Sequence, residues 1–278
     1  MSPRTAPRSL ALALGGGGAR GIGHIPVIEA LDELGLRPAA IAGSSIGSLI
    51  GAALAAGMSG KEIRRHVIAF AHDRAEVFRR LVVARSGAFA RLFASGGATL
   101  VDAEKFCAQF LPEPLPETFE DLPVPLTIIA SDLHRRRQVA FSSGPLRPAL
   151  AASITLPALM RPVVIGDMVL VDGGVTNPLP FDTLRGRADV VVAVDISGEP
   201  SETRRDIPSP FECIASCVLT MGNAIISEKL KHSAPDLMIR PNVGIFRTLD
   251  FFQASAILRA AEPARAAITS ALPPLLGF

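Results

Sequence analysis

Two glycine-framed turns near the start of the chain constrain its fold more than any other feature. They are GGGGARG at 15–21 and GSSIGS at 43–48. Each follows a short apolar run and opens into a segment with apolar residues at helical spacing, which predicts a strand-to-helix turn in both places. Strands that alternate with helices in this way predict a parallel sheet with right-handed crossover connections.

The rest of the chain continues this alternation, so the predicted fold class is α/β. Apolar runs predict strands at 9–14, 39–43, 123–133, 135–144, 188–197 and 235–241, and a hairpin at 163–174 with its turn at Gly166–Asp167. Apolar residues at helical spacing predict helices at 25–34, 46–57, 211–232 and 250–272, and amphipathic helical structure over 61–111. The β-branched run at 188–197 is typical of a fully buried central parallel strand.

The composition predicts a single folded domain and excludes a nucleic-acid-binding role. Of the 278 residues, 49% are hydrophobic and 19% are charged, which is enough apolar material for a full core. The 28 basic and 26 acidic residues leave a net charge of only +2, without the basic excess that nucleic acid requires. We expect a flexible tail at 1–8 and one catalytic domain over 9–278.

The cysteines and the apolar runs bear on the location of the protein. Cys107, Cys213 and Cys217 are odd in number and irregular in spacing, which argues against a disulfide framework. They have no histidine cluster beside them, so no metal is expected. No apolar run reaches the roughly 18 residues that span a bilayer. These observations favour a cytoplasmic protein with reduced, buried thiols and no membrane span.

Two segments are candidates for peripheral contact with a membrane. The stretch 78–100 carries Phe and Leu between small residues, and it lies within 61–111, which is a candidate helical lid. A connecting loop packed on the body is the alternative interpretation of this stretch. The apolar carboxyl terminus, LPPLLGF, is the second candidate, because exposed apolar segments bind at bilayer interfaces.

Ser45 is the candidate nucleophile. It stands in the frame G-x-S-x-G, with Gly43 and Gly47 on either side, between a predicted buried strand and an apolar helix. Such a frame places a serine on a sharp turn, and its glycines keep the strained backbone free of clashes. The helix that begins near Ile46 directs its free N–H groups and its dipole at the same point, where they favour a developing negative charge.

The first glycine turn has two functional interpretations. Gly16, Gly18 and Gly21 match the dinucleotide fingerprint, but that site needs an acidic residue about 20 positions further on, and the second strand ends in AGSS. A phosphate loop is excluded because no G-K-[ST] follows. The remaining interpretation is an oxyanion hole formed by the N–H groups of Gly16, Gly17 and Gly18, with Arg20 bracing the loop or facing a substrate head group.

The base that would activate Ser45 is harder to identify. None of the five histidines has the setting of a triad histidine, and His24, one helical turn past the glycine loop, is more typical of packing or capping. A carboxylate is the alternative, and Asp172 stands out because it follows an apolar strand and precedes Gly173 and Gly174. Partial burial would raise the pKa of its carboxyl group and make it a better base.

The motifs resemble those of the patatin-like phospholipase family, in particular its bacterial members with little beyond the catalytic domain. The resemblance rests on these segments, in the family's order: GGGGARGIGHIPVIEAL at 15–31, AGSSIGSLIGAALAAG at 42–57, AASITLPALMRPV at 151–163, LVDGGVTNPLP at 170–180 and DVVVAVDIS at 189–197. It implies a three-layer α/β/α fold with a mainly parallel central sheet. It also implies a Ser–Asp dyad of Ser45 and Asp172, and an oxyanion loop at Gly16, Gly17 and Gly18, followed by Arg20.

The resemblance implies hydrolysis of carboxylic esters of lipids through an acyl-Ser45 intermediate, without metal or cofactor. A phospholipase A, a lysophospholipase and an esterase all fit this description, with a lipid or fatty-acyl ester as the substrate. Transfer of the acyl group to an alcohol is one alternative. A non-catalytic lipid-binding regulator is another.

Overall fold

The computed structural model describes residues 8–72, 101–112, 115–198, 207 and 210–278. The predicted tail at 1–8, except for Arg8, and the Phe- and Leu-bearing stretch at 78–100 lie outside the described residues. The candidate lid at 61–111 is described only at its two ends.

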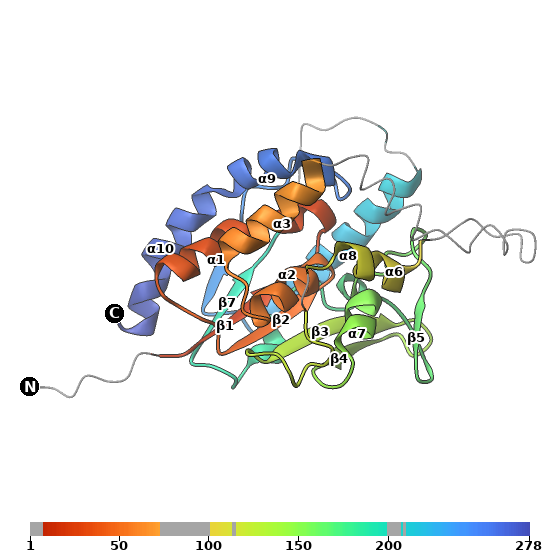
Figure 1. Ribbon diagram of the computed structural model, residues 1–278, viewed down its shortest axis with the longest axis horizontal. Helices are drawn as coiled ribbons and strands as arrows, with labels where there is room; N and C mark the ends of the chain where they lie inside the picture. The colour runs from red at the N-terminus through yellow and green to blue at the C-terminus, as the bar shows by residue number, and fades with distance from the viewer. Residues whose placement is uncertain (1–7, 73–100, 113–114, 199–206, 208–209) are drawn as a thin grey trace, which may run out of the picture.

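An eight-stranded sheet forms the centre of the molecule (Figure 1). Its strands follow the order β5-β6-β3-β2-β1-β7-β8, and β4 pairs with β3. The parallel part consists of β1 (Leu10–Leu14), β2 (Ala40–Ser44), β3 (Leu126–Asp132), β7 (Val190–Val194) and β8 (Leu237–Ile239). The antiparallel part consists of β4 (Arg137–Phe141), β5 (Val163–Ile165) and β6 (Met168–Asp172).

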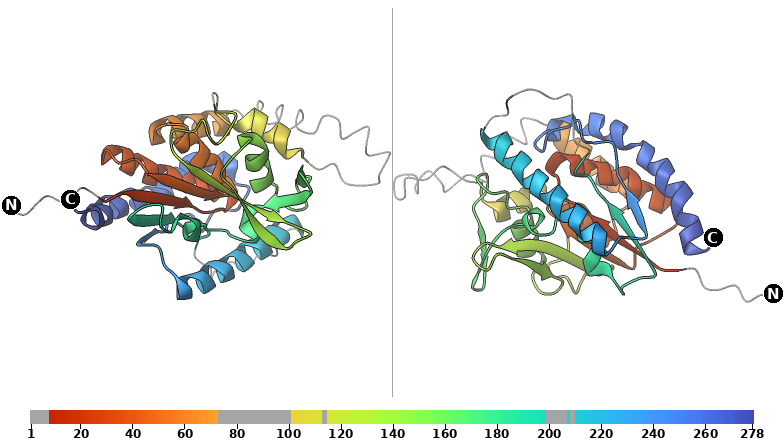
Figure 2. Two further views of the ribbon diagram at one scale, coloured as in Figure 1. Left: turned by 90° about the horizontal axis from the view of Figure 1, so that it is seen from below. Right: turned by 180° about the vertical axis from the view of Figure 1, so that it is seen from behind.

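Helices cover both faces of this sheet, so the predicted three-layer α/β/α architecture is confirmed. One face carries α1 (His24–Glu33), α2 (Ile46–Ala55), α3 (Gly60–His72), α6 (Ala103–Phe110), α7 (Leu146–Ser153), α9 (Ala254–Ala261) and α10 (Pro263–Leu276). The opposite face carries α8 (Pro210–His232) and the short 3₁₀ turn η3 (Phe181–Leu184). The view along the sheet in Figure 2 shows the three layers.

The alternation of side chains along β1 explains why the two faces differ. Leu10, Leu12 and Leu14 belong to the large core under the many-helix face, whereas Ala11 and Ala13 belong to a smaller core on the other side. Successive residues of a strand point to opposite faces of a sheet. The leucines therefore fill the thick layer, and the alanines leave room only for close packing of η3 and α8.

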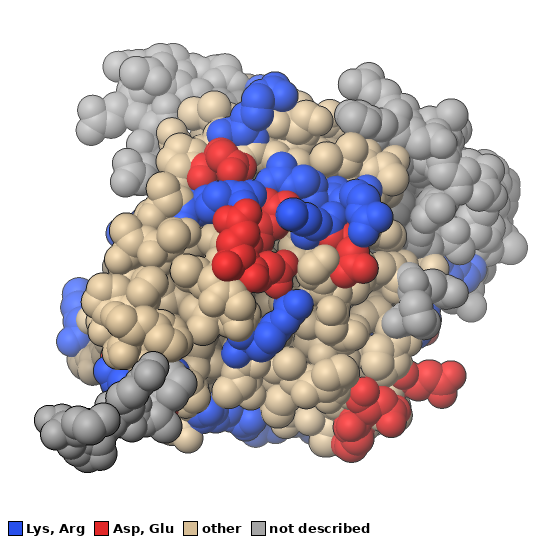
Figure 3. Space-filling model, turned by 60° about the vertical axis from the view of Figure 1, so that its left-hand side comes forward, with Lys and Arg blue, Asp and Glu red and all other residues tan. Residues whose placement is uncertain are grey.

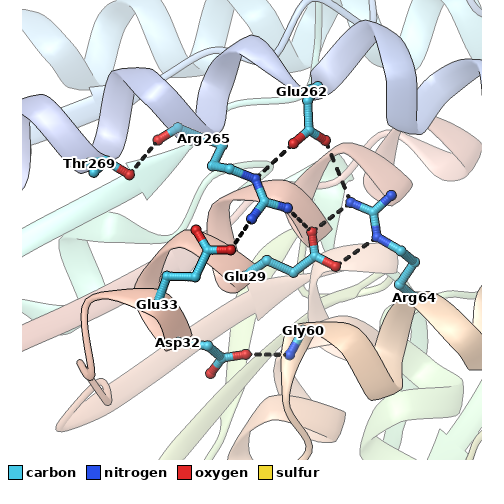
Figure 4. A network of polar contacts seen from close by, with 8 residues as sticks. All are labelled: Glu29, Asp32, Glu33, Gly60, Arg64, Glu262, Arg265 and Thr269. Atoms are coloured by element: carbon cyan, nitrogen blue, oxygen red, sulfur yellow. Dashed lines mark hydrogen bonds and ion pairs between the residues drawn. The ribbon is translucent and has the colours of Figure 1, made fainter.

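A buried glutamate fastens the helices of the many-helix face together (Figure 4). Glu29 of α1 is only 3% exposed, and its carboxylate accepts hydrogen bonds from Arg64 of α3 and Arg265 of α10. Arg265 also pairs with Glu33 and Glu262. Basic and acidic side chains accordingly lie interleaved where these helices meet (Figure 3). A buried carboxylate needs such paired donors to remain charged.

Two helices differ from the prediction. Helix α7 has no predicted counterpart, and its Pro148 lies in the first turn, where its missing N–H removes no hydrogen bond. The predicted helix at 250–272 is divided into α9 and α10, and Pro263 begins the second of them. Other predicted strands and helices within the described chain are present, with ends that differ by a few residues.

Two observations bear on the predicted contact with a membrane. The carboxyl-terminal LPPLLGF is mostly part of α10, where Leu272 and Leu276 are buried in the core and Phe278 is 69% exposed. The sequence predicted no segment long enough to span a bilayer. By length and composition, however, α8 meets that criterion over Cys213–His232, with a mean hydropathy of 1.2 and 11% of its apolar window buried.

Candidate active site

Strand β3 brings the two predicted catalytic residues together. Its residue Ile129 pairs with Ser44, the last residue of β2, and its next residue, Ala130, pairs with Asp172, the last residue of β6. The ends of β2 and β6 therefore meet at neighbouring positions along one strand. This register places Ser45 and Asp172 side by side although 127 residues separate them in sequence.

Ser45 occupies a strained turn between β2 and α2. Its φ of 54° and ψ of −127° are unusual for a residue with a side chain, and such strain is typical of functional sites. The turn is tight at Gly47, where an added Cβ would approach the carbonyl oxygen of Leu14 to 2.2 Å. The backbone N–H of Ser45 donates to the hydroxyl of Ser153 at 3.0 Å, which fixes the turn from the side of α7.

Asp172 faces Ser45 from the end of β6. The hydroxyl of Ser45 donates to Oδ2 of Asp172 at 2.5 Å, and the N–H of Gly174 donates to Oδ1 at 2.7 Å. The carboxyl group is only 2% exposed. Burial raises its pKa to about 6, against the smaller lowering effects of the hydrogen bonds from Ser45 and Gly174. A carboxylate with this pKa is well suited to accept a proton near neutral pH.

The glycine loop lies beside Ser45 and offers two N–H donors. An added Cβ on Gly16 would lie 3.2 Å from Cβ of Ser45. The N–H of Gly16 donates to the carbonyl of Pro178 at 2.9 Å, so it is already occupied. Within the described residues, the N–H groups of Gly17 and Gly18 have no such acceptor. Of the three glycines predicted to form an oxyanion hole, only Gly17 and Gly18 therefore have N–H groups without an acceptor among the described residues.

Arg20 holds the loop in place rather than facing the space around Ser45. Its guanidinium donates to the carbonyl oxygens of Phe246 at 2.8 Å, of Ser197, and of Gly244 at 3.4 Å. These three carbonyls belong to segments that follow β7 and β8. Of the two roles expected for Arg20, the contacts favour bracing of the loop.

His24 supports the glycine loop, whereas the sequence indicated only a packing or capping residue. Its side chain is completely buried, and Nε2 lies 2.9 Å from the carbonyl oxygen of Gly15, the first residue of the loop. Burial lowers the pKa of the imidazole to about 4. The ring is therefore neutral at physiological pH and donates from Nε2 to Gly15, which fixes the peptide that leads into the glycine loop. In the sequence, this contact could have been inferred from the position of His24, which follows Gly15 by nine residues.

Ser45 lies where two cavities of very different size meet. The larger, of about 420 Å³, extends between α2, α3 and α6, and its described lining is apolar apart from Ser45 and His66. The smaller, of about 50 Å³, lies between the glycine loop, Asp172 and α8. Gly18, Ser45 and Leu156 line both cavities. The larger cavity is thus lined by apolar side chains of the many-helix face, and the smaller one brings Ser45 and Asp172 against apolar residues of α8.

The described residues contain no group of three or more His, Cys, Asp or Glu side chains that could hold a metal ion. Cys107 is buried under the many-helix face, and burial raises the pKa of its thiol to about 12. Cys213 and Cys217 are exposed on α8. The prediction that these thiols are buried is therefore wrong for two of the three, because the outer side of α8 faces away from the sheet.

Two solved structures share the fold of this chain. VipD from Legionella pneumophila matches 95% of the chain and 67% of its own with a TM-score of 0.51 at 15% identity. Human GIVD cytosolic phospholipase A2, solved with a methyl γ-linolenyl fluorophosphonate inhibitor, matches 96% of the chain and 59% of its own with a TM-score of 0.51 at 14% identity. Identities this low indicate a shared fold only.

Sequence relatives give the closer comparison. An uncharacterized NTE family protein of Mycobacterium tuberculosis is 37% identical over 205 residues, which cover 73% of this chain. A lysophospholipase of Aspergillus niger is 28% identical over 274 residues, or 90% of the chain and 17% of the relative. The chain spans about half the length of the mycobacterial relative, 52%. The family model for patatin-like phospholipases matches residues 12–185, and the chain therefore belongs to the patatin-like phospholipase family.

Proposed function

We propose that this protein hydrolyses carboxylic esters of lipids, with Ser45 as nucleophile and Asp172 as base. The observation that carries the proposal is the 2.5 Å hydrogen bond from Ser45 Oγ to Asp172 Oδ2. It lies beside an apolar cavity and two N–H groups, of Gly17 and Gly18, that have no acceptor in the described part of the chain. The family to which the chain belongs and the lysophospholipase relative support the same activity.

The geometry supports a two-step reaction. Ser45 Oγ attacks the ester carbonyl carbon while Asp172 takes its proton, and the N–H groups of Gly17 and Gly18 stabilise the oxyanion. The intermediate collapses, Asp172 returns the proton to the leaving alkoxide oxygen, and an acyl ester on Ser45 remains. Water then attacks this ester, Asp172 takes the proton from the water, and the second collapse releases the fatty acid as the proton returns to Ser45.

The shapes of the two cavities support a division of the substrate at the ester bond. The acyl chain fits the large cavity of about 420 Å³, because burial of methylene groups against an apolar lining is favourable at about 0.8 kcal/mol each. The alcohol side and the attacking water lie toward the small cavity beside Asp172. A fatty-acyl ester of a cytoplasmic or membrane lipid is the substrate class we infer.

Covalent labelling of Ser45 is the experiment that tests this proposal. A fluorophosphonate with a long alkyl chain should add its mass to the peptide that contains Ser45 and abolish esterase activity. Ser45→Ala should remove both the label and the activity, and Asp172→Asn should slow both.

Two matched controls keep the test specific. Ser270→Ala removes an exposed hydroxyl on α10, and Asp167→Asn removes a carboxylate that is 81% exposed in the β5–β6 hairpin. Both controls should label and turn over like the unmodified protein. Full esterase activity in Ser45→Ala, or labelling at a different serine, would refute the dyad.

A further inference from the structure

The large cavity has an open end and a closed end, and the residues at the closed end limit the length of chain it can hold. We propose that Ala53, Met58 and Ile63, which we call the blind end, set the longest acyl chain that Ser45 accepts. The inference rests on the proposed function, because it concerns the acyl chain of the same ester. It adds the class of acyl group, an extended chain of about ten carbons, and the residues that select it.

Helix α2 forms one wall of the cavity along its whole length. Its lining residues recur at the three- and four-residue spacing that places side chains on one side of a helix, and they are Ile46, Leu49, Ile50 and Ala53. The helix begins directly after Ser45, so this wall starts at the nucleophile and ends at Ala53. Ala53 follows Ser45 by eight residues, which is about 12 Å along a helix.

The end of the cavity beside Ser45 is open to the surface. Gly18 lines the cavity there, and an added Cβ on Gly18 would lie 2.2 Å from the carbonyl oxygen of Thr248. The next residue, Leu249, and its neighbour Phe252 line the same cavity and are 41% and 44% exposed. An ester therefore reaches Ser45 at this end, and its acyl chain extends along α2 away from the surface.

The opposite end of the cavity is closed by the turn that joins α2 to α3, two helices that lie side by side on one face of the sheet (Figure 1). Ala53 and Ile63 are only 3% and 2% exposed, and Met58 packs partly buried against the core. The N–H of Met58 donates to the carbonyl oxygen of Ala53 at 3.1 Å, and Gly57 has the positive φ that ends a helix. An acyl chain therefore cannot pass this end unless the turn opens.

The depth of the cavity gives the length of the chain. A fully extended chain of single bonds advances about 1.2 Å per bond, so about ten bonds cover the distance from Ser45 to Ala53. Each methylene group up to that length is buried against apolar side chains, whereas a further one meets the closed turn. Ala53 is the smallest side chain on the α2 wall, where the other three are Ile or Leu. Its size therefore keeps the last part of the cavity open.

The chain-length profile of the unmodified protein is the first test. With p-nitrophenyl esters, kcat/KM should rise by up to about fourfold per methylene group from butyrate to decanoate, because each group is buried in the cavity. It should rise no further from decanoate to myristate. A rise that continues undiminished to myristate overturns the proposal, because the chain then passes the blind end.

Substitutions at the blind end should move this limit in both directions. Ala53→Phe shortens the cavity and should lower the ratio of kcat/KM for decanoate to that for butyrate at least about tenfold. Met58→Ala lengthens the cavity and should raise the ratio for myristate to that for decanoate. Both ratios are taken within one preparation, so a fraction of unfolded protein does not change them. Ratios equal to those of the unmodified protein in both variants overturn the proposal.

Two control variants make the same exchanges outside the cavities. Ala56→Phe changes the residue that caps α2, and Met221→Ala changes a side chain on α8 that is 55% exposed. Neither residue belongs to the described lining of either cavity. Both controls should keep the chain-length profile of the unmodified protein. Equal shifts in Ala56→Phe and Ala53→Phe contradict the proposal, because the cause is then the packing of α2 and not the length of the cavity.

Binding of a free fatty acid separates this inference from the proposed function. Ser45→Ala lacks the proposed nucleophile, and calorimetry should show that it binds decanoate and that adding Ala53→Phe weakens this binding at least about tenfold. The same result with a protein that turns over no ester would contradict the proposed function and still support the blind end. Equal decanoate affinity with and without Ala53→Phe overturns the inference, whether or not the protein is an esterase.

Discussion

The two faces of the sheet differ in the size of their cores and in how their helices are held. The face under α1, α3 and α10 has the large core and the ion-pair network around Glu29. The other face has a small core, and α8 is held there chiefly by Gly222, Ile226 and the contacts of Lys229, with its outer side exposed. Ser45 and Asp172 lie at the boundary, where the smaller cavity meets α8. The many-helix face therefore contains the large cavity as well as the ion-pair network, and the α8 face closes the small cavity beside Asp172.

The largest expected effect concerns Asp172, which lies at this boundary. Asp172→Asn removes the proposed base, and we expect esterase kcat/KM to fall by more than about 10³-fold. The same change should stabilise the fold at pH 8. Folding raises the pKa of Asp172 from 3.8 to about 6, so its stabilising contribution is complete below pH 4 and is lost as pH rises through 6, at a cost of about 3 kcal/mol.

Thermal unfolding at pH 8 and at pH 4 measures this trade between activity and stability. The variant should melt several degrees above the unmodified protein at pH 8, and the difference should shrink at pH 4. An equal melting temperature at pH 8 would mean that Asp172 is solvated and not the buried carboxylate of the structure. Asp167→Asn is the control, and it should change neither quantity.

The second prediction tests the many-helix face. Glu29→Ala leaves two arginines without the buried carboxylate they share, and we expect the free energy of unfolding to fall by about 3–5 kcal/mol. Urea denaturation measures the loss, and titration with the fluorophosphonate gives the activity per folded molecule, which should be unchanged. Glu33→Ala, half-exposed at the edge of the same network, should cost less than about 1 kcal/mol. Equal losses in the two variants would contradict the role of the buried network.

The third prediction is the pH dependence of turnover. Asp172 accepts a proton only in its charged form, so kcat/KM should fall about tenfold per pH unit below pH 6 and level off above it. The pH profile with a soluble short-chain ester measures this acidic limb. His24 stays neutral across the range because burial lowers its pKa to about 4. A limb centred near pH 4 would show that the carboxylate is not desolvated in the free enzyme.

The smallest expected effect concerns α8, on the face of the sheet with the small core. Lys229→Met removes the contacts of the ammonium group with Asn177, Asp182 and the ring of Phe181, and it should destabilise the fold by only about 1 kcal/mol. Hydrogen exchange should become faster in α8 and stay unchanged in α1 and α10. Lys231→Met, on the exposed side of the same turn, is the control. Faster exchange across the whole molecule would contradict independent anchoring of α8.

The sequence predicted the parallel part of the sheet because each strand there is an unbroken apolar run. It also supplied Ser45 and Asp172 as candidates, since both follow such runs and precede glycines. It could not show that the N–H of Gly16 is occupied by Pro178, or that Arg20 contacts three carbonyls, because those contacts join segments far apart in the chain. The exposure of Cys213 and Cys217 was missed for the same reason, since helical spacing does not say which side meets a sheet.

The register of β3 has a consequence for how such a chain can vary. Ile129 and Ala130 set the spacing between the ends of β2 and β6, where Ser45 and Asp172 lie. A shift of β3 by one residue against either neighbouring strand would separate Ser45 from Asp172, whereas a substitution in the wall of the large cavity leaves this register unchanged. Substitutions in the wall of the large cavity should therefore change which substrate binds without moving Ser45 and Asp172, so this wall is the place to redesign substrate choice.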